Sequence, residues 1–226
     1  MIIITGGSAG IGNAIAQTLR EEGELVYTLS RRMLDSEFHI ECDITDYESL
    51  KKVYRHIKDL NKGKVKALIN CAGIASMNLA LTTPASVTNK VIQTNLIGTI
   101  YSNQIFAPLL IKSGGGKIIN FSTIAVPIAL KGESIYVASK AGVEGFSKSF
   151  ANELAGFKIT VNCIAPGPIQ TNLLKGISEK QISRIIDRQI IKRNMYTKDV
   201  VSIVKLILSD LSNNITGQII HVGGVA

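Results

Sequence analysis

The chain has 226 residues, of which 46% are hydrophobic and 19% are charged. These values are typical of one globular domain that can bury a full core. No uninterrupted apolar run reaches about 18 residues, so the sequence predicts no membrane span. The formal net charge is +8, but the basic residues are dispersed and only 5% of the residues are aromatic. We therefore expect no nucleic-acid binding, and a phosphate-bearing cofactor or an acidic partner explains the charge more simply.

Short apolar segments alternate with longer segments of helical periodicity along the whole chain. Strands are expected near residues 1–5, 25–30, 38–42, 66–71, 116–122, 158–164 and 218–222, and helices near 12–22, 46–60, 84–112, 134–156, 178–191 and 197–210. This alternation predicts one α/β domain over residues 1–226, with a doubly wound, mostly parallel sheet of about seven strands flanked by helices. Ligands of such sheets bind at the carboxyl ends of the strands.

The three cysteines, Cys42, Cys71 and Cys163, are far apart and lack the spacing of metal ligands. Buried reduced thiols are therefore expected, and no metal site is predicted. The first expected strand starts at Met1, which leaves no room for a targeting segment. These features lead us to expect a cytoplasmic protein.

A glycine-rich turn follows the first expected strand and precedes the first expected helix. The segment from Thr5 to Gly12 reads TGGSAGIG. Its glycines Gly6, Gly10 and Gly12 lack the Cβ atoms that would hinder a tight turn and the close approach of a pyrophosphate. The free N–H groups and the dipole at the start of the helix favour an anion. The alternative is a plain turn between a strand and a helix.

Tyr136 and Lys140 lie four residues apart in an expected helix, so their side chains share one face. An ammonium beside a phenol favours phenolate and lowers a pKa that is normally about 10. Tyr136 is therefore a candidate acid and base at neutral pH. Alone, such a pair is more often an ordinary helix surface, and its weight comes from the glycine-rich turn in the same chain.

Five motifs in order resemble those of the short-chain dehydrogenase/reductase family over essentially the whole chain. They are the TGGSAGIG turn, Asn70-Cys71-Ala72-Gly73, Asn95, the YVASK segment that begins at Tyr136, and the segment APGPIQT that ends at Thr171. Within the family, the sequence is most similar in character to the 3-oxoacyl-carrier-protein reductases. The resemblance implies a Rossmann-type fold and an NAD(P)H-dependent enzyme that moves a hydride between a nicotinamide and a carbonyl carbon.

The resemblance also implies a role for each site residue. Tyr136 would donate a proton to the carbonyl oxygen, and Lys140 would hold the ribose and lower the Tyr136 pKa. Asn95 would anchor a water that passes protons to Lys140. Thr123 stands where the family has a Ser, thirteen positions before the Tyr, with Ser122 as the alternate. The residues assigned to cofactor binding are Gly6, Ser8, Gly10, Ile11, Gly12, Ser30, Arg31, Arg32, Asp43, Ile44, Asn70, Ala72, Gly73, Tyr136, Lys140, Pro166, Gly167, Ile169 and Thr171.

The end of the second expected strand favours NADP(H), with NAD(H) as the alternative. NAD-selective relatives carry an Asp there, whereas this chain reads Ser30-Arg31-Arg32. Two guanidinium groups can bind a 2′-phosphate that no carboxylate repels, unless both are plain surface residues. Few residues separate Arg32 from the third expected strand, so we expect an open loop there instead of a crossover helix.

Residues 172–195 form the segment that covers the substrate in the family. Apolar residues at near-helical spacing suggest a hydrophobic or long substrate, unless they pack this segment on the core: Ile177, Ile182, Ile185, Ile186 and Ile190. Basic residues would suit an acidic acyl carrier protein or a phosphorylated substrate, unless they form a solvated face: Lys175, Lys180, Arg184, Arg188, Lys192 and Arg193.

Three functions stay open at this stage. The first is NADPH-dependent reduction of a ketone, or the reverse alcohol oxidation, with a 3-oxoacyl thioester as a candidate substrate. The second is reduction of a sugar, a steroid-like compound or another small carbonyl compound. The third is an NADP(H)-binding sensor or scaffold with weak or no catalysis. Val143, Phe146 and Phe150 suggest a second apolar face on a long helix, so we expect a homodimer or homotetramer.

Overall fold

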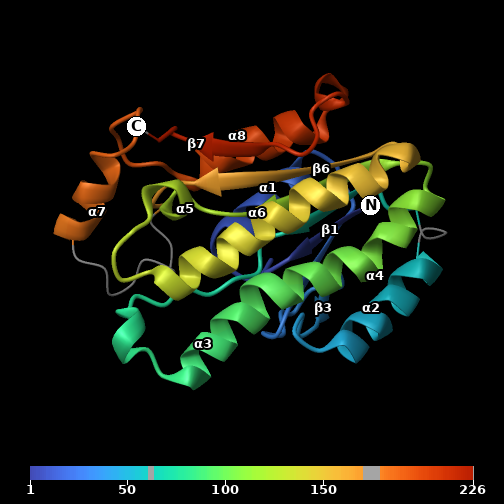
Figure 1. The fold of residues 1–226 in the computed structure, drawn as a ribbon. Coiled ribbons are helices and arrows are strands. Elements are labelled where there is room, and N and C mark those ends of the chain that lie inside the picture. The colour runs from blue at the N-terminus through green and yellow to red at the C-terminus, as the bar shows by residue number, and fades with distance from the viewer. Residues whose placement is uncertain (61–63, 170–178, 226) are drawn as a thin grey trace.

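The computed structural model describes residues 1–60, 64–169 and 179–225. Its centre is a sheet of seven strands in the order β3-β2-β1-β4-β5-β6-β7 (Figure 1), and every neighbouring pair is parallel. The strands are β1 Ile2–Thr5, β2 Val26–Ser30, β3 His39–Glu41, β4 Ala67–Asn70, β5 Gly116–Phe121, β6 Ile159–Pro166 and β7 Ile219–Val222. The strand order reverses between β1 and β4, and the fold places a ligand crevice at their carboxyl ends. The predicted doubly wound sheet is confirmed.

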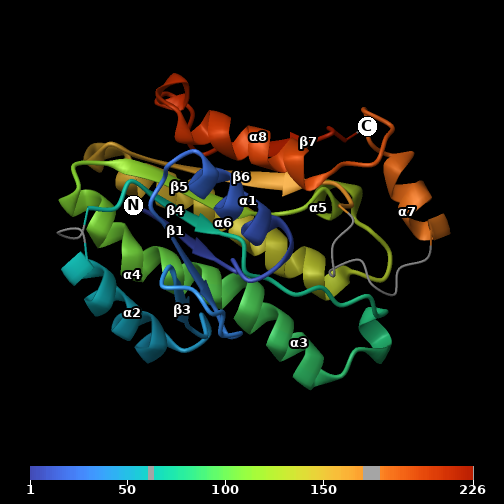
Figure 2. The same cartoon turned by 180° about the vertical axis from the view of Figure 1, so that it is seen from behind.

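Helices cover both faces of the sheet. The described helices are α1 Gly10–Glu21, α2 Tyr47–Asp59, α3 Ala85–Ile92, α4 Gly98–Lys112, α5 Ala125–Ile128, α6 Ser134–Leu154, α7 Glu179–Ile186 and α8 Thr197–Leu208. Figure 1 shows α2, α4 and α6 on one face, and Figure 2 shows α1 and α8 on the other. None of the described helices is long and apolar enough to cross a membrane.

Two hydrophobic cores lie on opposite faces of the sheet, because successive strand residues point in opposite directions. Ile3 packs in the core beneath α2, α4 and α6, whereas Ile2 and Ile4 pack in the core beneath α1 and α8. All three are fully buried. Both faces are covered, which explains why the strands read as continuous apolar runs in the sequence.

A row of polar side chains crosses the middle of the sheet on the face that carries α4 and α6. Thr5, Asn70, Asn120 and Cys163 are partners in register on β1, β4, β5 and β6. The Asn70 Nδ2 donates to Asn120 Oδ1 at 2.8 Å, and the Asn120 Nδ2 donates to Ser147 Oγ of α6 at 2.8 Å. This row therefore ties the central strands to each other and to α6.

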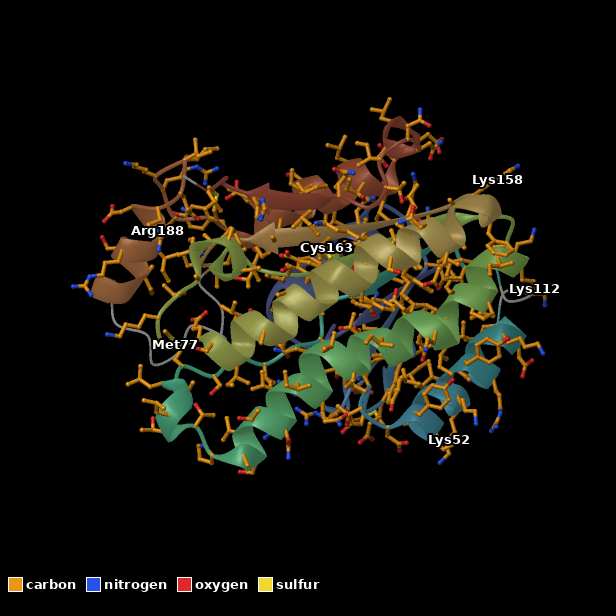
Figure 3. The ribbon with its side chains drawn as sticks, in the orientation of Figure 1. Lys52, Met77, Lys112, Lys158, Cys163 and Arg188 are labelled. Carbon is orange, nitrogen blue, oxygen red and sulfur yellow. The ribbon has the colours of Figure 1, made fainter. Side chains whose placement is uncertain are left out.

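The helix expected over 84–112 is interrupted. A π-helical turn, Gln93–Ile97, joins α3 to α4, and such turns often mark functional sites. Four short elements escaped the sequence prediction, the helix α5 and the 3₁₀ turns Ala80–Thr82, Ala155–Phe157 and Asp210–Ser212. Lys158, labelled in Figure 3, directly follows the second of these turns. Residues 31–38 contain neither helix nor strand, as expected for an open loop.

The residues expected to form an apolar face for self-association are mostly buried in the core. Val143 and Phe150 are buried within the single chain, where Phe150 packs in the core beneath α2, α4 and α6. Only Phe146 is half-buried, and its ring stacks on that of Phe150 at 5.0 Å. The residues offered for a second apolar face are thus largely core residues, and a homodimer or homotetramer stays a prediction.

Candidate active site

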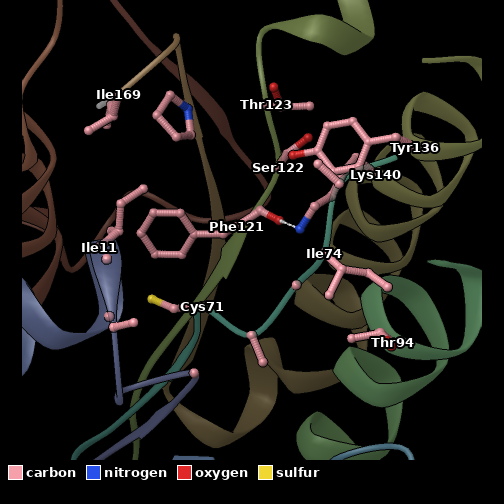
Figure 4. Close-up of a pocket in the computed structure, with 18 of the residues that line it drawn as sticks. Ile11, Cys71, Ile74, Thr94, Phe121, Ser122, Thr123, Tyr136, Lys140 and Ile169 are labelled. Atoms are coloured by element: carbon pink, nitrogen blue, oxygen red, sulfur yellow. Dashed lines mark hydrogen bonds between the residues drawn. The ribbon is translucent and has the colours of Figure 1, made fainter. Parts of the chain in front are cut away.

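A cavity of about 660 Å³ lies at the carboxyl ends of the central strands (Figure 4). Nearly all residues assigned from the motifs line it: Gly6, Ser8, Gly10, Ile11, Gly12, Ser30, Arg31, Arg32, Asp43, Ile44, Ala72, Gly73, Ser122, Thr123, Tyr136, Lys140, Pro166, Gly167 and Ile169. Asn70 and Asn95 lie behind its wall, and Thr171 falls outside the described residues. Segments far apart in the sequence thus form one site.

The glycine-rich turn leaves a bare backbone cradle at one end of the cavity. Gly6 has φ +71°, and a Cβ there would lie 2.7 Å from Ala72 Cα. A Cβ on Gly12 would lie 2.5 Å from the Gly6 carbonyl oxygen. Helix α1 begins next to this turn, and Ala9 at its N-cap gives no side-chain hydrogen bond. Its first N–H groups are therefore left for a ligand, and this arrangement fits the pyrophosphate of a dinucleotide.

The end of the cavity beside the loop after β2 is polar and cationic. Arg31 and Arg32 are exposed and line the cavity. The Ser30 Oγ donates to the Arg32 carbonyl oxygen at 2.8 Å. Asp43 accepts hydrogen bonds from the N–H and the hydroxyl of Thr45, at 2.9 and 2.8 Å. This end fits an adenosine ribose whose 2′-substituent faces two guanidinium groups.

The opposite end holds Tyr136 and Lys140, both buried on the first turns of α6. The Lys140 Nζ donates to the Phe121 carbonyl oxygen at 2.8 Å (Figure 4), and burial lowers the pKa of Lys140 to about 8. Burial raises the pKa of Tyr136 above its ordinary value, Glu133 raises it further, and a hydrogen bond with Thr123 lowers it.

This direction differs from the expectation that Lys140 lowers the Tyr136 pKa. Burial is the largest cause, because it disfavours the charged phenolate, and the charge of Glu133 acts in the same direction. Lys140 also directs its ammonium to the backbone of β5. Tyr136 is therefore a neutral phenol at pH 7, which is the protonation state that a proton donor requires.

Ser122 and Thr123 point in different directions. Ser122 directly follows β5 and is buried, and its hydroxyl donates to Glu144 of α6 at 2.5 Å. The Thr123 Oγ1 accepts from the Ala125 N–H at 3.2 Å, which leaves its proton available for another acceptor. This geometry favours Thr123 over its neighbour as the site hydroxyl.

Asn95 supports the site from behind. It is fully buried in the π-helical turn and holds the loop after β4 by two hydrogen bonds, accepting from the Ile74 N–H at 2.8 Å and donating to the Ile74 carbonyl at 2.9 Å. Its Nδ2 also donates to Ser139 Oγ at 3.0 Å. A Cβ on Gly73 would lie 3.3 Å from Asn95 Oδ1 and 3.4 Å from Lys140 Nζ. The glycine lets these two polar groups approach each other.

Glu133 is a cavity residue that the sequence analysis missed. It lies one helical turn before Tyr136 and is 6% exposed, and burial raises the pKa of its carboxyl to about 7. The spacing from Tyr136 was the available signal, because residues three apart share a helix face. Spacing alone does not indicate that this turn is buried.

The described part of the expected substrate segment divides between the two interpretations. Ile185 is buried against Ile124 and Ile128 and lines the cavity, whereas Ile190 is 66% exposed. Arg188 donates to the Ile128 carbonyl at 3.0 Å, and Arg193 pairs with Asp199. Arg184 and Lys192 are exposed. Ile177 and the side chains of Lys175 and Lys180 fall outside the described residues.

Comparisons with known proteins agree with this geometry. A family model described as enoyl-(acyl carrier protein) reductase matches residues 6–225. The 3-oxoacyl-[acyl-carrier-protein] reductase FabG of Buchnera aphidicola subsp. Baizongia pistaciae is 33% identical, over 98% of this chain and 95% of that protein. The ligand-free aldohexose dehydrogenase of Thermoplasma acidophilum is 31% identical with a TM-score of 0.88, over 99% of this chain and 92% of that one. The structure of ElxO with NADP bound is 28% identical with a TM-score of 0.87, over 98% and 96% of the two chains.

The chain therefore belongs to the short-chain dehydrogenase/reductase family. It is an oxidoreductase of the NAD(P)H-dependent type that this family comprises. The expected fold, family and enzyme class are confirmed.

The first testable prediction separates the two adjacent hydroxyls. Thr123→Val keeps the shape but removes the free donor, so turnover should fall about 10²- to 10³-fold. Ser122→Ala removes a hydrogen bond to Glu144 outside the site and should cost less than about tenfold. Thr123→Ser keeps the donor and should be tolerated. Steady-state rates of the three variants decide the matter, and a larger loss in Ser122→Ala would transfer the role to Ser122.

Proposed function

We propose that the protein reduces a ketone carbonyl with NADPH as its preferred cofactor, and that a 3-oxoacyl thioester is its substrate. The arrangement of Tyr136, Thr123 and Lys140 at the inner end of a dinucleotide-shaped cavity carries this proposal. A relative that is 33% identical and named 3-oxoacyl-[acyl-carrier-protein] reductase supports the substrate class. When bound, the cofactor would supply the hydride, and the chain supplies position and protons.

Tyr136 and Thr123 act on the carbonyl oxygen. The Tyr136 phenol keeps its proton at neutral pH because burial raises its pKa, so it can donate that proton as negative charge develops on the oxygen. Thr123 donates the hydroxyl proton that its own contact with Ala125 leaves free, and this second hydrogen bond holds the oxygen in place. Both donors are fixed by α6 and the end of β5.

Lys140 completes the site with a proton that is exchangeable near physiological pH. Its pKa of about 8 is low because the ammonium is buried. It can therefore return a proton toward Tyr136 after turnover, and its Nζ lies beside the cavity to bind a ribose hydroxyl. Asn95 positions this end through the loop after β4.

Exposed basic side chains near the C-terminal end of the chain suit an acidic partner. Arg184 and Lys192 are exposed on either side of Ile185, Arg188 and Gln189. An acyl carrier protein is the partner of the proposed thioester substrate, and this positive charge would speed its encounter.

The second testable prediction removes the proposed acid. Tyr136→Phe should lower turnover about 10²- to 10⁴-fold while the dissociation constant for NADPH stays within about twofold, because only one hydroxyl is lost. Tyr101→Phe is the matched control, since Tyr101 packs against Tyr47 outside the cavity. NADPH oxidation with a 3-oxoacyl thioester gives the rate. Near-normal turnover in Tyr136→Phe would refute the assignment, and binding without turnover in the wild type would favour a sensor.

The third testable prediction concerns the cofactor. Ser30→Asp combined with Arg31→Ala should reverse a wild-type preference for NADPH over NADH. Each charge-assisted hydrogen bond from an arginine to the 2′-phosphate contributes about ten- to a hundredfold in affinity. The new carboxylate repels that phosphate and accepts hydrogen bonds from the ribose diol. Titration of both nucleotides measures the change, and equal wild-type affinities would contradict the proposed preference.

A second candidate substrate class is favoured by Glu133. A buried carboxyl one turn from Tyr136 can accept a hydrogen bond from a substrate hydroxyl, and an apolar acyl chain offers none. A structural relative named aldohexose dehydrogenase is 31% identical. A sugar or another polyhydroxylated carbonyl compound is thus the alternative substrate.

The fourth testable prediction decides between these substrates. For a polyhydroxylated substrate, Glu133→Leu should lower kcat/KM at least about tenfold, because a substrate hydroxyl is left without its partner. For a 3-oxoacyl thioester the same change should be neutral or favourable. Glu153→Leu, an exposed position on the same helix, controls for the loss of charge. Aldohexoses and 3-oxoacyl thioesters are compared with each variant.

A further inference from the structure

The loop after β2 replaces the usual crossover helix, and one histidine beneath it has no assigned role. Residues 31–38 carry Arg31 and Arg32, the two cations at the adenosine end of the cavity. This loop, residues 31–38, forms no helix of its own. The hydrogen bonds that hold its backbone therefore decide how well these guanidinium groups are placed.

His39 lies directly under this loop. It is the first residue of β3, is 7% exposed and pairs in register with Thr28 of β2. Its ring lies on the face of the sheet that carries α1, because Thr28 and Ser30 alternate with Leu29, which packs in the opposite core. His39 does not line the cavity, so it does not contact the ligand directly.

The ring nitrogens of His39 bridge the sheet and the loop. Nδ1 lies 2.9 Å from Thr28 Oγ1, and Nε2 lies 2.9 Å from the Arg32 carbonyl oxygen and 3.3 Å from Ser30 Oγ. A ring protonated on Nε2 accounts for the contact with the loop, since Nε2 then donates to the Arg32 carbonyl, and Nδ1 shares a hydrogen bond with the Thr28 hydroxyl. The ring is thus held on one side by β2 and holds Arg32 on the other.

The Arg32 carbonyl is the loop's anchor. Among the described residues, the backbone of residues 31–35 hydrogen-bonds to the strands at this carbonyl alone, through Ser30 and His39. The far end of the loop is fixed separately, where Arg20 and the Thr28 N–H donate to the Phe38 carbonyl. The span that carries both arginines has no other hydrogen-bonded support from the sheet.

We propose that His39 is a positioning residue for the 2′-phosphate of NADP(H), and that it acts by fixing the Arg32 backbone so that Arg31 and Arg32 face the phosphate. A backbone that is already fixed loses less conformational entropy when the two arginines bind a phosphate. This inference rests on the proposed preference for NADP(H). It adds a specificity determinant that lies outside the cavity wall.

A matched pair of variants tests the role of the Nε2 donor. The amide nitrogen of glutamine is as many bonds from Cβ as Nε2 is, whereas that of asparagine is one bond closer. His39→Asn should therefore weaken NADP⁺ binding about three- to tenfold, while His39→Gln should retain it within about twofold. Binding of NAD⁺, which lacks the 2′-phosphate, should stay within about twofold in both. The chain contains no tryptophan, so titration calorimetry of the purified protein is the suitable measurement.

A mutant cycle distinguishes positioning from simple damage to the fold. In a background of Arg31→Ala with Arg32→Ala, His39→Asn should no longer affect NADP⁺ binding by more than about twofold, because it acts through the removed side chains. Equal weakening of NADP⁺ and NAD⁺, or unchanged NADP⁺ binding in His39→Asn, would overturn the inference. A wild type without preference for NADP⁺ would overturn the cofactor proposal itself, and that result is recognised before any variant is made.

Discussion

The hydrogen bond between Asn120 and Ser147 fixes helix α6 on the sheet, and the catalytic end of the cavity depends on it. Tyr136, Lys140, Val143 and Ser147 follow one another at helical spacing on the same face of α6. When Ser147 binds Asn120 of β5, the other members of that face are set in register above β5. Lys140 then reaches the Phe121 carbonyl, one residue beyond Asn120. Tyr136, the proposed acid, and Lys140 are therefore placed by the contact of Ser147 with Asn120, which lies two helical turns from Lys140.

This contact belongs to a polar row inside the sheet, and the row is costly to disturb. Asn70, Asn103 and Asn120 are buried, and Asn103 Nδ2 also donates to Asn120 Oδ1, at 3.1 Å. Removing one member would leave buried donors or acceptors without partners, at about 1–3 kcal/mol each. The row includes the last residues of β1 and β4, so it also fixes where the site loops after these two strands begin. Gly6 follows Thr5, and Cys71 follows Asn70.

The sequence predicted the features that depend on local pattern. Strand positions follow from continuous apolar runs such as Ile2 to Ile4, because both faces of the sheet are covered. The glycine-rich turn was predictable because a Cβ at Gly6 or Gly12 would clash with nearby backbone atoms. Counting back thirteen positions from Tyr136 favoured Thr123 over Ser122. That choice stays a prediction, and the hydrogen bond from Ser122 to Glu144 supports it.

The features that sequence reasoning missed or misjudged depend on distances between segments. The direction of the Tyr136 pKa follows from how completely the site is buried, and a Tyr–Lys spacing carries no information about burial. Glu133 and His39 belong to no motif. Glu133 becomes a cavity residue through the packing of α6, and His39 reaches the loop after β2 from the neighbouring strand β3. Val143 and Phe150 resembled an open face until the sheet beneath α6 covered them.

The two ends of the cavity differ in how they would bind their ligands. At the proposed adenosine end the charges of Arg31 and Arg32 are exposed, so they can attract a phosphate but hold it only as firmly as their backbone is fixed. At the proposed catalytic end Tyr136 and Lys140 are buried, and desolvation moves their pKa values in opposite directions. A buried phenol gains strength as a donor, because electrostatic interactions strengthen where the local dielectric is low. The position of the backbone therefore limits binding at the first end, and burial of the side chains sets the protonation states at the second.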